Sequence, residues 1–229
     1  MRLAPVLTLA VAASLMSGCA GDEPSVALLV ADGSSAYAVD TDAFEERVRD
    51  ICEECSVTVY DAGGDAAEQR SQARQAEAES ADVLVVVPVV PEELESLTGG
   101  DVPLVSLGTL VPGADRHVGL VGEDLDADEP QPGSDLDAAR ELILGDRSSM
   151  TYVPTVEMSR QAADVSGALL EGSPVPGGEE VEGVESWTYE TQEITLDSLT
   201  TVLVGQGILT IDELCEGETA TRCAGLGLR

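Results

Sequence analysis

Short apolar runs alternate with amphipathic segments through the first half of the chain. Val26–Ala31 and Val83–Val87 are continuous apolar runs, the pattern of strands buried on both faces of a parallel sheet. Between them, Phe44, Val48 and Ile51 recur at helical spacing and predict an amphipathic helix. The first half therefore begins with a buried strand followed by an amphipathic helix.

The same patterns predict further strands and helices up to residue 123. The strands are expected at Ser56–Tyr60, Val102–Leu107 and His117–Val121, and the helices at Asp65–Glu79 and Pro91–Leu97. Regular alternation of strands and helices indicates an α/β fold with a parallel sheet and helices on both faces. Ligands of such sheets bind beyond the carboxyl ends of the strands.

The second half is less regular. An acidic Pro/Gly-rich linker is expected at 124–134, and 172–185 is similarly rich in Pro, Gly and Glu. The other expected elements are a helix at Asp135–Leu144, a strand at Met150–Tyr152, a helix at Val156–Leu170, an extended Glu193–Leu196 and a helix opened by the Thr210–Glu213 capping box. We therefore divide the mature chain into an N-terminal α/β lobe (19–123), the linker (124–134) and a C-terminal segment (135–229).

The first residues have the pattern of a secretory signal. Arg2 precedes a short apolar run, and the small residues Ser17 and Gly18 come directly before Cys19. The apolar run is too short to span a membrane, which takes about 20 residues. The sequence resembles bacterial lipoprotein signals, which implies a signal peptide at 1–18 and a diacylglyceryl group on the Cys19 thiol. An ordinary signal peptide with a chance cysteine is the alternative.

Composition limits the partners of the mature chain. The whole sequence contains 44 acidic residues against 11 basic ones, all of them arginines, and its formal net charge is −33. Binding to nucleic acid phosphates needs basic side chains, so nucleic acid is not expected as a partner. Anionic lipid head groups would also repel the chain, so membrane attachment would depend on the lipid. The acidity is explained by solubility outside the cell or by adaptation to salt, and a specific cationic partner is the alternative.

Four cysteines follow Cys19, and export permits disulfides. The simplest pairing is local, Cys52–Cys55 and Cys215–Cys223. A redox or metal role for the first pair is the alternative. However, the neighbouring Glu53 and Glu54 would raise thiol pKa values and disfavour a reactive thiolate.

The sequence contains no recognisable catalytic or metal-binding motif. His117 is the only histidine, and its place at a strand start predicts a surface or edge residue. There is no GxSxG, Gly-rich phosphate loop or HExxH pattern. We therefore expect no enzyme activity, no metal and no cofactor.

The order of segments resembles the periplasmic sugar-binding proteins of ABC importers, most closely the xylose-binding type. The resemblance is carried by three stretches, VALLVADGSSAY with the strands and helices that follow to VPLVSL, then PGSDLDAARELILGDRSSMTYVPTVEMSRQAADVSGALLEG, then LTTVLVGQGILTIDELCEGETATRC. It implies two α/β lobes that close on a monosaccharide. A mature chain of 211 residues is shorter than two full lobes, which need roughly 250–300 residues. The deficit falls between Glu123 and Pro132, so the second lobe should be a remnant with a tail that returns to the first lobe.

The resemblance also locates candidate ligand residues. Only Asp135 stands where the family keeps an acidic sugar ligand, and a helix N-cap is its alternative role. Asp32, Ser34 and Tyr37 belong to the loop after the first strand, where the family has a basic residue. Gly108-Thr109, Val121-Gly122 and Val153 replace charged or amide ligands of the family. Losing these groups weakens recognition of sugar hydroxyls.

Two functions are compatible with these observations. The first is a membrane-anchored solute-binding lipoprotein on the extracytoplasmic face, which would deliver a pentose-like monosaccharide to an ABC permease with impaired affinity. The second is a degenerate envelope lipoprotein that acts as a scaffold or interaction module.

Overall fold

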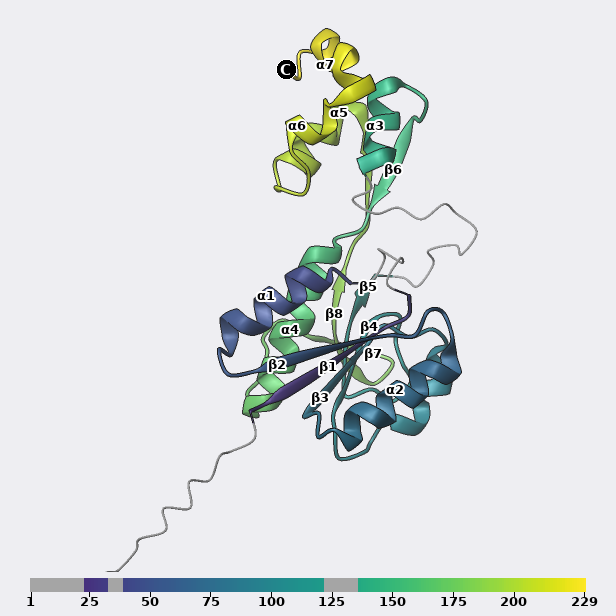
Figure 1. Cartoon of the computed structure of the whole chain (residues 1–229), viewed down its shortest axis with the longest axis vertical. Helices are drawn as coiled ribbons and strands as arrows, with labels where there is room; N and C mark the ends of the chain where they lie inside the picture. The colour runs from purple at the N-terminus through teal and green to yellow at the C-terminus, as the bar shows by residue number, and fades with distance from the viewer. Residues whose placement is uncertain (1–22, 33–38, 122–135) are drawn as a thin grey trace, which may run out of the picture.

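The structure, a computed structural model, describes residues 23–32, 39–121 and 136–229. Its described part forms a larger α/β lobe and a smaller, mostly helical lobe that lie end to end (Figure 1). No helix in these ranges is long and apolar enough to span a membrane.

The first lobe is built on a seven-stranded sheet flanked by helices. The strands are β1 (Ser25–Val30), β2 (Ser56–Asp61), β3 (Val83–Val86), β4 (Leu104–Gly108), β5 (Arg116–Leu120), β7 (Glu179–Val181) and β8 (Val184–Tyr189). The helices are α1 (Thr41–Ile51), α2 (Ala66–Ala78), the 3-10 helix η1 (Pro91–Leu97) and α4 (Thr155–Glu171).

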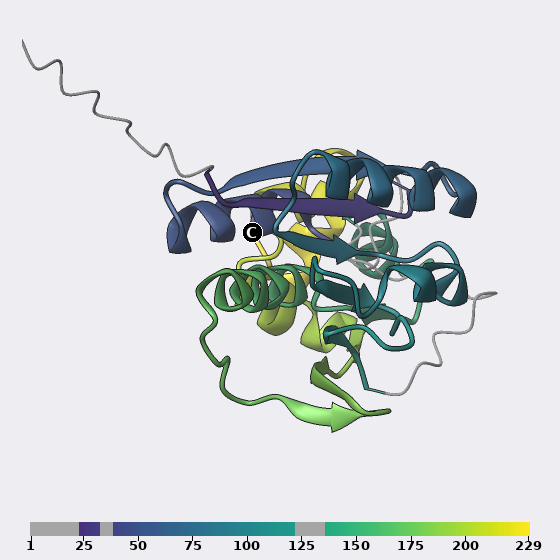
Figure 2. The ribbon, with the colours of Figure 1, turned by 90° about the horizontal axis from the view of Figure 1, so that it is seen from below.

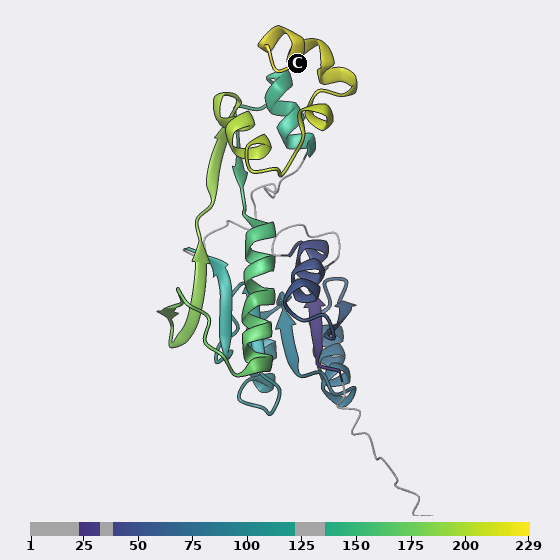
Figure 3. The same ribbon diagram turned by 90° about the vertical axis from the view of Figure 1, so that its left-hand side faces the viewer.

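The sheet order is β2-β1-β3-β4-β5-β8-β7, and every pairing is parallel except that of β7 with β8. Figure 2 shows the sheet from β2 at the top to β7 at the bottom. Side chains of the central strands alternate between two apolar layers. Leu28 packs toward α1 and α4, whereas Leu29 packs toward α2 and η1. Figure 3 shows α1 and α4 side by side in front of the sheet. The predicted parallel sheet with helices on both faces is confirmed.

The second lobe contains a two-stranded antiparallel sheet and short helices. Its elements are α3 (Leu136–Leu144), β6 (Ser149–Tyr152), β9 (Gln192–Thr195), α5 (Leu196–Leu199), the π-helical turn η2 (Thr200–Val204), α6 (Ile211–Leu214), η3 (Gly217–Thr219) and α7 (Ala220–Leu226). They enclose a separate apolar core around Leu142, Ile194 and Leu203. The remnant of a second lobe expected from the sequence is therefore a small lobe with its own core.

The chain passes between the lobes at two described places, after β6 and after β8. The prediction that residues 135–229 pack back on the first lobe is correct only for the segment from α4 to β8. The tail from β9 onward packs with α3 in the second lobe, because its apolar side chains belong to that core. The expected return of the tail to the first lobe is wrong.

Two strands of the main sheet, β7 and β8, were not predicted. Residues 172–185 were expected to be irregular, yet they contain β7 and the start of β8. β8 pairs with β5 in parallel, and Trp187 is buried against α4 in the main core. Long-range pairing with β5 stabilises this strand, and the surrounding glycines and glutamates concealed its pattern.

Candidate functional site

The carboxyl ends of the parallel strands lie at the edge of the sheet that faces the second lobe (Figure 1). We call the described residues there the inter-lobe edge. They are Asp32 after β1, Val87–Val90 after β3, Thr109 after β4 and Val121 after β5. This is where ligands bind in open parallel sheets. Asp32 and Thr109 are exposed, and Val121 is 57% exposed.

Of the candidate ligand residues, only Asp32 is described. Ser34, Tyr37 and Asp135 lie outside the described residues, as does Cys19. Asp32 lies at the inter-lobe edge, just after β1, and its role as a ligand stays a prediction. No arginine is present in the described residues of this edge. Gly108 ends β4, and Val153 is fully buried in the main core.

A buried amide fixes the turn after β3. The Gln69 side chain of α2 is fully buried; its Nε2 donates to the Val87 carbonyl at 2.8 Å, and its Oε1 accepts from the Val89 N–H at 2.9 Å. Both bonds hold the chain as it leaves the sheet. Nothing local in the sequence marks a glutamine on a helix as a clamp, so this role of Gln69 was not predictable.

Two tyrosines hold the crossover segments against α4. The Tyr152 hydroxyl, at the end of β6, donates to Glu157 Oε2 at 3.2 Å, and the Tyr189 hydroxyl, at the end of β8, donates to Gln161 Oε1 at 3.3 Å. Burial raises the pKa of both hydroxyls, and the Glu157 carboxylate raises each pKa further. The tyrosines are therefore neutral donors at physiological pH. Both hydrogen bonds therefore join the ends of β6 and β8 to α4.

His117 is buried, which contradicts its predicted place at the surface. Its ring is 4% exposed, because β5 directs the ring into the layer on the α2 side of the sheet. Its Nδ1 lies 3.0 Å from the Ser106 hydroxyl of β4, a residue with no exposed surface. Desolvation lowers the pKa of His117 to about 4. The imidazole of His117 is therefore neutral, and both side chains are buried where no substrate could reach them. We interpret the pair as a contact of the core.

Both predicted disulfides are present. Cys52–Cys55 joins the end of α1 to the segment before β2, and Cys215–Cys223 joins the end of α6 to α7. No group of His, Cys, Asp or Glu side chains among the described residues could hold a metal ion.

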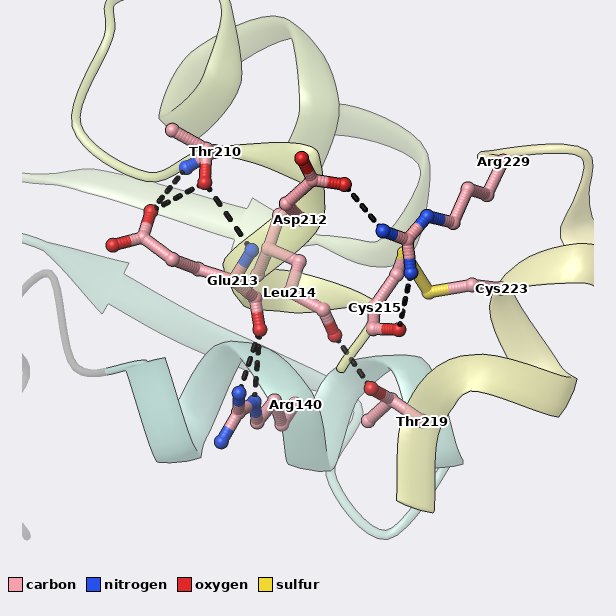
Figure 4. A network of polar contacts seen from close by, with 9 residues as sticks. All are labelled: Arg140, Thr210, Asp212, Glu213, Leu214, Cys215, Thr219, Cys223 and Arg229. Carbon is pink, nitrogen blue, oxygen red and sulfur yellow. Dashed lines mark hydrogen bonds and ion pairs between the residues drawn. A yellow bond between two sulfur atoms is a disulfide. The ribbon is translucent and has the colours of Figure 1, made fainter. Parts of the chain in front are cut away.

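Figure 4 shows how the second lobe holds the end of the chain. Arg140 of α3 donates to the Glu213 carbonyl at 2.7 Å, and Thr219 donates to the Leu214 carbonyl at 2.6 Å. Arg229 donates to Asp212 at 2.5 Å and to the carbonyl of disulfide-bonded Cys215 at 3.2 Å. The tail is therefore tied to the helices by a disulfide and by charged donors.

Comparison with solved structures places this architecture among known folds. The sequence matches no protein-family model, and no curated protein matches it. A solute-binding protein of an ABC transporter from Clostridium phytofermentans, solved with β-D-glucose, superposes with a TM-score of 0.65 at 9% identity, over 83% of this chain and 99% of that one. A carbohydrate transporter solute-binding protein from Chloroflexus aurantiacus, solved with D-glucose, superposes with a TM-score of 0.64 at 11% identity, over 83% of this chain and 97% of that one.

The myo-inositol binding protein of Caulobacter gives a TM-score of 0.62 at 12% identity, over 81% of this chain and 98% of that one. These neighbours have the type 1 periplasmic binding fold, which the chain therefore shares. The fold expected from the resemblance in sequence is confirmed. At identities this low, the likeness concerns the fold alone.

Proposed function

We propose that this protein is a solute-binding lipoprotein, anchored through Cys19 on the extracytoplasmic face of the cell membrane. It would present a small neutral solute to an ABC permease. The observation that carries the proposal is the type 1 periplasmic binding fold, in which strand ends of one lobe face a second lobe across two described crossovers. Neighbours of this fold were solved with glucose or inositol, which supports a sugar-like solute.

The inter-lobe edge favours a neutral solute over an anion. None of its described residues is basic, whereas Asp32 contributes a carboxylate and Thr109 a hydroxyl. A carboxylate can accept hydrogen bonds from sugar hydroxyls, but it repels anionic groups. Because bidentate arginine donors are missing from these residues, we propose that affinity for monosaccharides is impaired.

A second candidate function is a scaffold that no longer binds solute. It is favoured by the small second lobe, whose described residues form a two-stranded sheet and short helices as the opposite wall of the site. A shallow wall excludes less water and weakens every polar contact with a solute. Such a protein would act through protein contacts at the envelope.

Thermal unfolding separates the two functions. A chain that begins at residue 20 retains every described element and can be tested with D-xylose, D-ribose, D-glucose and myo-inositol at about 10 mM. A solute with a Kd of about 1 mM would stabilise the fold by roughly 1.4 kcal/mol. The same measurement with D-gluconate is the control, which should give no shift. An absence of stabilisation by every sugar would favour the scaffold.

The anchor is tested separately by Cys19→Ala. In a bacterial host, the native chain should carry diacylglyceryl and sediment with membranes, because two acyl chains give stable attachment. The variant should lack the lipid. Recovery of the native chain without lipid would contradict anchoring without affecting the solute test.

A further inference from the structure

A groove of about 500 Å³ lies at the edge of the sheet opposite the second lobe. Pro24, just before β1, the Cys52–Cys55 disulfide and the last three turns of α4 contribute to its walls. These segments lie where the strands begin, around the lower end of α4 in Figure 3. Gln161 of the lining also contacts a crossover, through the Tyr189 hydroxyl. None of the described residues of the inter-lobe edge lines the groove, so its role does not depend on the solute proposed above.

The groove follows one side of α4. Gln161, Asp164, Ala168 and Glu171 line it and recur three or four residues apart, so they lie along one stripe of the helix. The stripe extends over about 15 Å at the rise of an α-helix. Ile51 of α1 closes the groove at Gly167, where an added Cβ would lie 2.5 Å from Ile51 Cδ1. The lining combines apolar side chains such as Ile51, Leu170 and Val175 with the polar side chains of α4.

The walls of the groove are held in place before any ligand arrives. The disulfide fixes the end of α1 relative to the start of β2. Across the groove, Trp187 Nε1 donates to the Pro176 carbonyl at 3.1 Å, and the rings of Pro174 and Pro176 restrict the backbone. Walls that are already ordered reduce the entropy that binding would cost.

Charge selects among the ligands that would fit. No basic side chain is among the lining residues described. Asp164 is paired with Arg47 at 2.7 Å, whereas Glu171 has no ion pair within the described part of the chain. Glu171 also ends the 17-residue helix α4, where the helix dipole is negative. The end of the groove therefore favours a cationic head group and repels a carboxylate.

We propose that this groove is a binding site for small amphipathic cations, with an aliphatic chain against the apolar side chains of the lining and an ammonium group near Glu171. Its volume lies in the usual range of small-molecule sites, about 300–1,000 Å³, and few polar groups converge on it. Nothing in the solute-binding role requires this site.

The test compares ligands that share a chain and differ in charge. Calorimetric titration of the chain from residue 20 is done with n-octylammonium, n-octanol and n-octanoate, all below their aggregation concentrations. We expect octylammonium to bind tightest and octanoate roughly five- to tenfold more weakly. Affinity should rise roughly twofold per methylene from hexylammonium to decylammonium. An open groove buries only about half of each methylene, which contributes about half of the free energy of full burial.

Substitutions locate the binding to the groove. Ser173→Trp fills the groove from an exposed lining position and should lower octylammonium affinity at least fivefold, whereas Ser71→Trp, on the exposed side of α2, should not. Glu171→Gln should bring octylammonium down to the affinity of octanol. No saturable binding of octylammonium, equal binding of octanoate, or equal effects of the two tryptophans would overturn the proposal.

Discussion

At the residue scale, the shape of the inter-lobe edge depends on buried polar side chains more than on exposed ones. Gln69 is fully buried and bonds to backbone groups on both sides of Pro88. Asp32, by contrast, is exposed at the end of its strand. A change at Gln69 should therefore alter both stability and the geometry of the loop after β3.

Gln69→Ala should destabilise the protein by roughly 1–3 kcal/mol, because it leaves the Val87 carbonyl and the Val89 N–H without their buried partner. Urea unfolding measures the change. Gln75→Ala on the same helix is the matched control, since Gln75 is exposed, and it should stay within about 0.5 kcal/mol of the native chain. Equal losses in the two variants would contradict the clamp.

His117 makes stability depend on pH in a defined window. Its pKa is about 4 in the folded protein, against about 6.5 when unfolded. Below pH 6.5 the unfolded chain therefore takes up a proton that the folded chain does not, and stability falls. Linkage gives a loss of about 2 kcal/mol from this group between pH 7.5 and 5.

His117→Gln removes that titration and keeps a polar group beside Ser106. The free energy of unfolding in urea should fall between pH 7.5 and pH 5 by about 2 kcal/mol more in the native chain than in the variant. The carboxylates also titrate in this range, but they contribute equally in the two proteins. The same loss in both proteins would show that His117 is not buried in its neutral form.

At the element scale, the second lobe depends on a covalent link. Cys215 and Cys223 are both fully buried, and their disulfide joins α6 to α7. The double variant Cys215→Ser, Cys223→Ser should lose roughly 2–3 kcal/mol of local stability. Hydrogen exchange should quicken in α6 and α7 and stay unchanged in β1 and β3. Equal acceleration in both lobes would contradict the separate cores.

Elements with a strong local pattern were predictable from the sequence. β1 and β3 are buried on both faces and have the continuous apolar runs that such burial requires, and α1 has apolar residues at helical spacing. β8 was not predictable in this way. Its buried residues include Ser186, and its place in the sheet comes from pairing with β5, more than 60 residues earlier in the chain.

The candidate site was less predictable than the fold. The rule that ligands bind at carboxyl ends located the inter-lobe edge, and Asp32 lies there. Gln69 and Tyr189 act through contacts with segments 18 and 28 residues away, so no local motif marks them. The contact of Tyr152 with Glu157 is local, but it depends on the turn from β6 into α4. His117 was misplaced because a single residue in a short strand does not reveal which layer its side chain enters.

At the scale of the whole molecule, the two lobes are separate apolar cores joined by narrow crossovers. Each lobe buries its apolar side chains in its own core, without help from the other lobe. The contact between the lobes therefore need not be rigid. The hydrogen bonds of Tyr152 and Tyr189 lie at the crossovers and attach them to α4. A solute between the lobes would draw them together.

Closure of the lobes tests the proposed solute-binding role most directly. Small-angle X-ray scattering of the chain from residue 20 gives the radius of gyration with and without about 10 mM of each sugar. We expect a smaller radius with at least one of D-xylose, D-ribose, D-glucose and myo-inositol, and no change with D-gluconate. An unchanged radius with all four would contradict a solute site between the lobes.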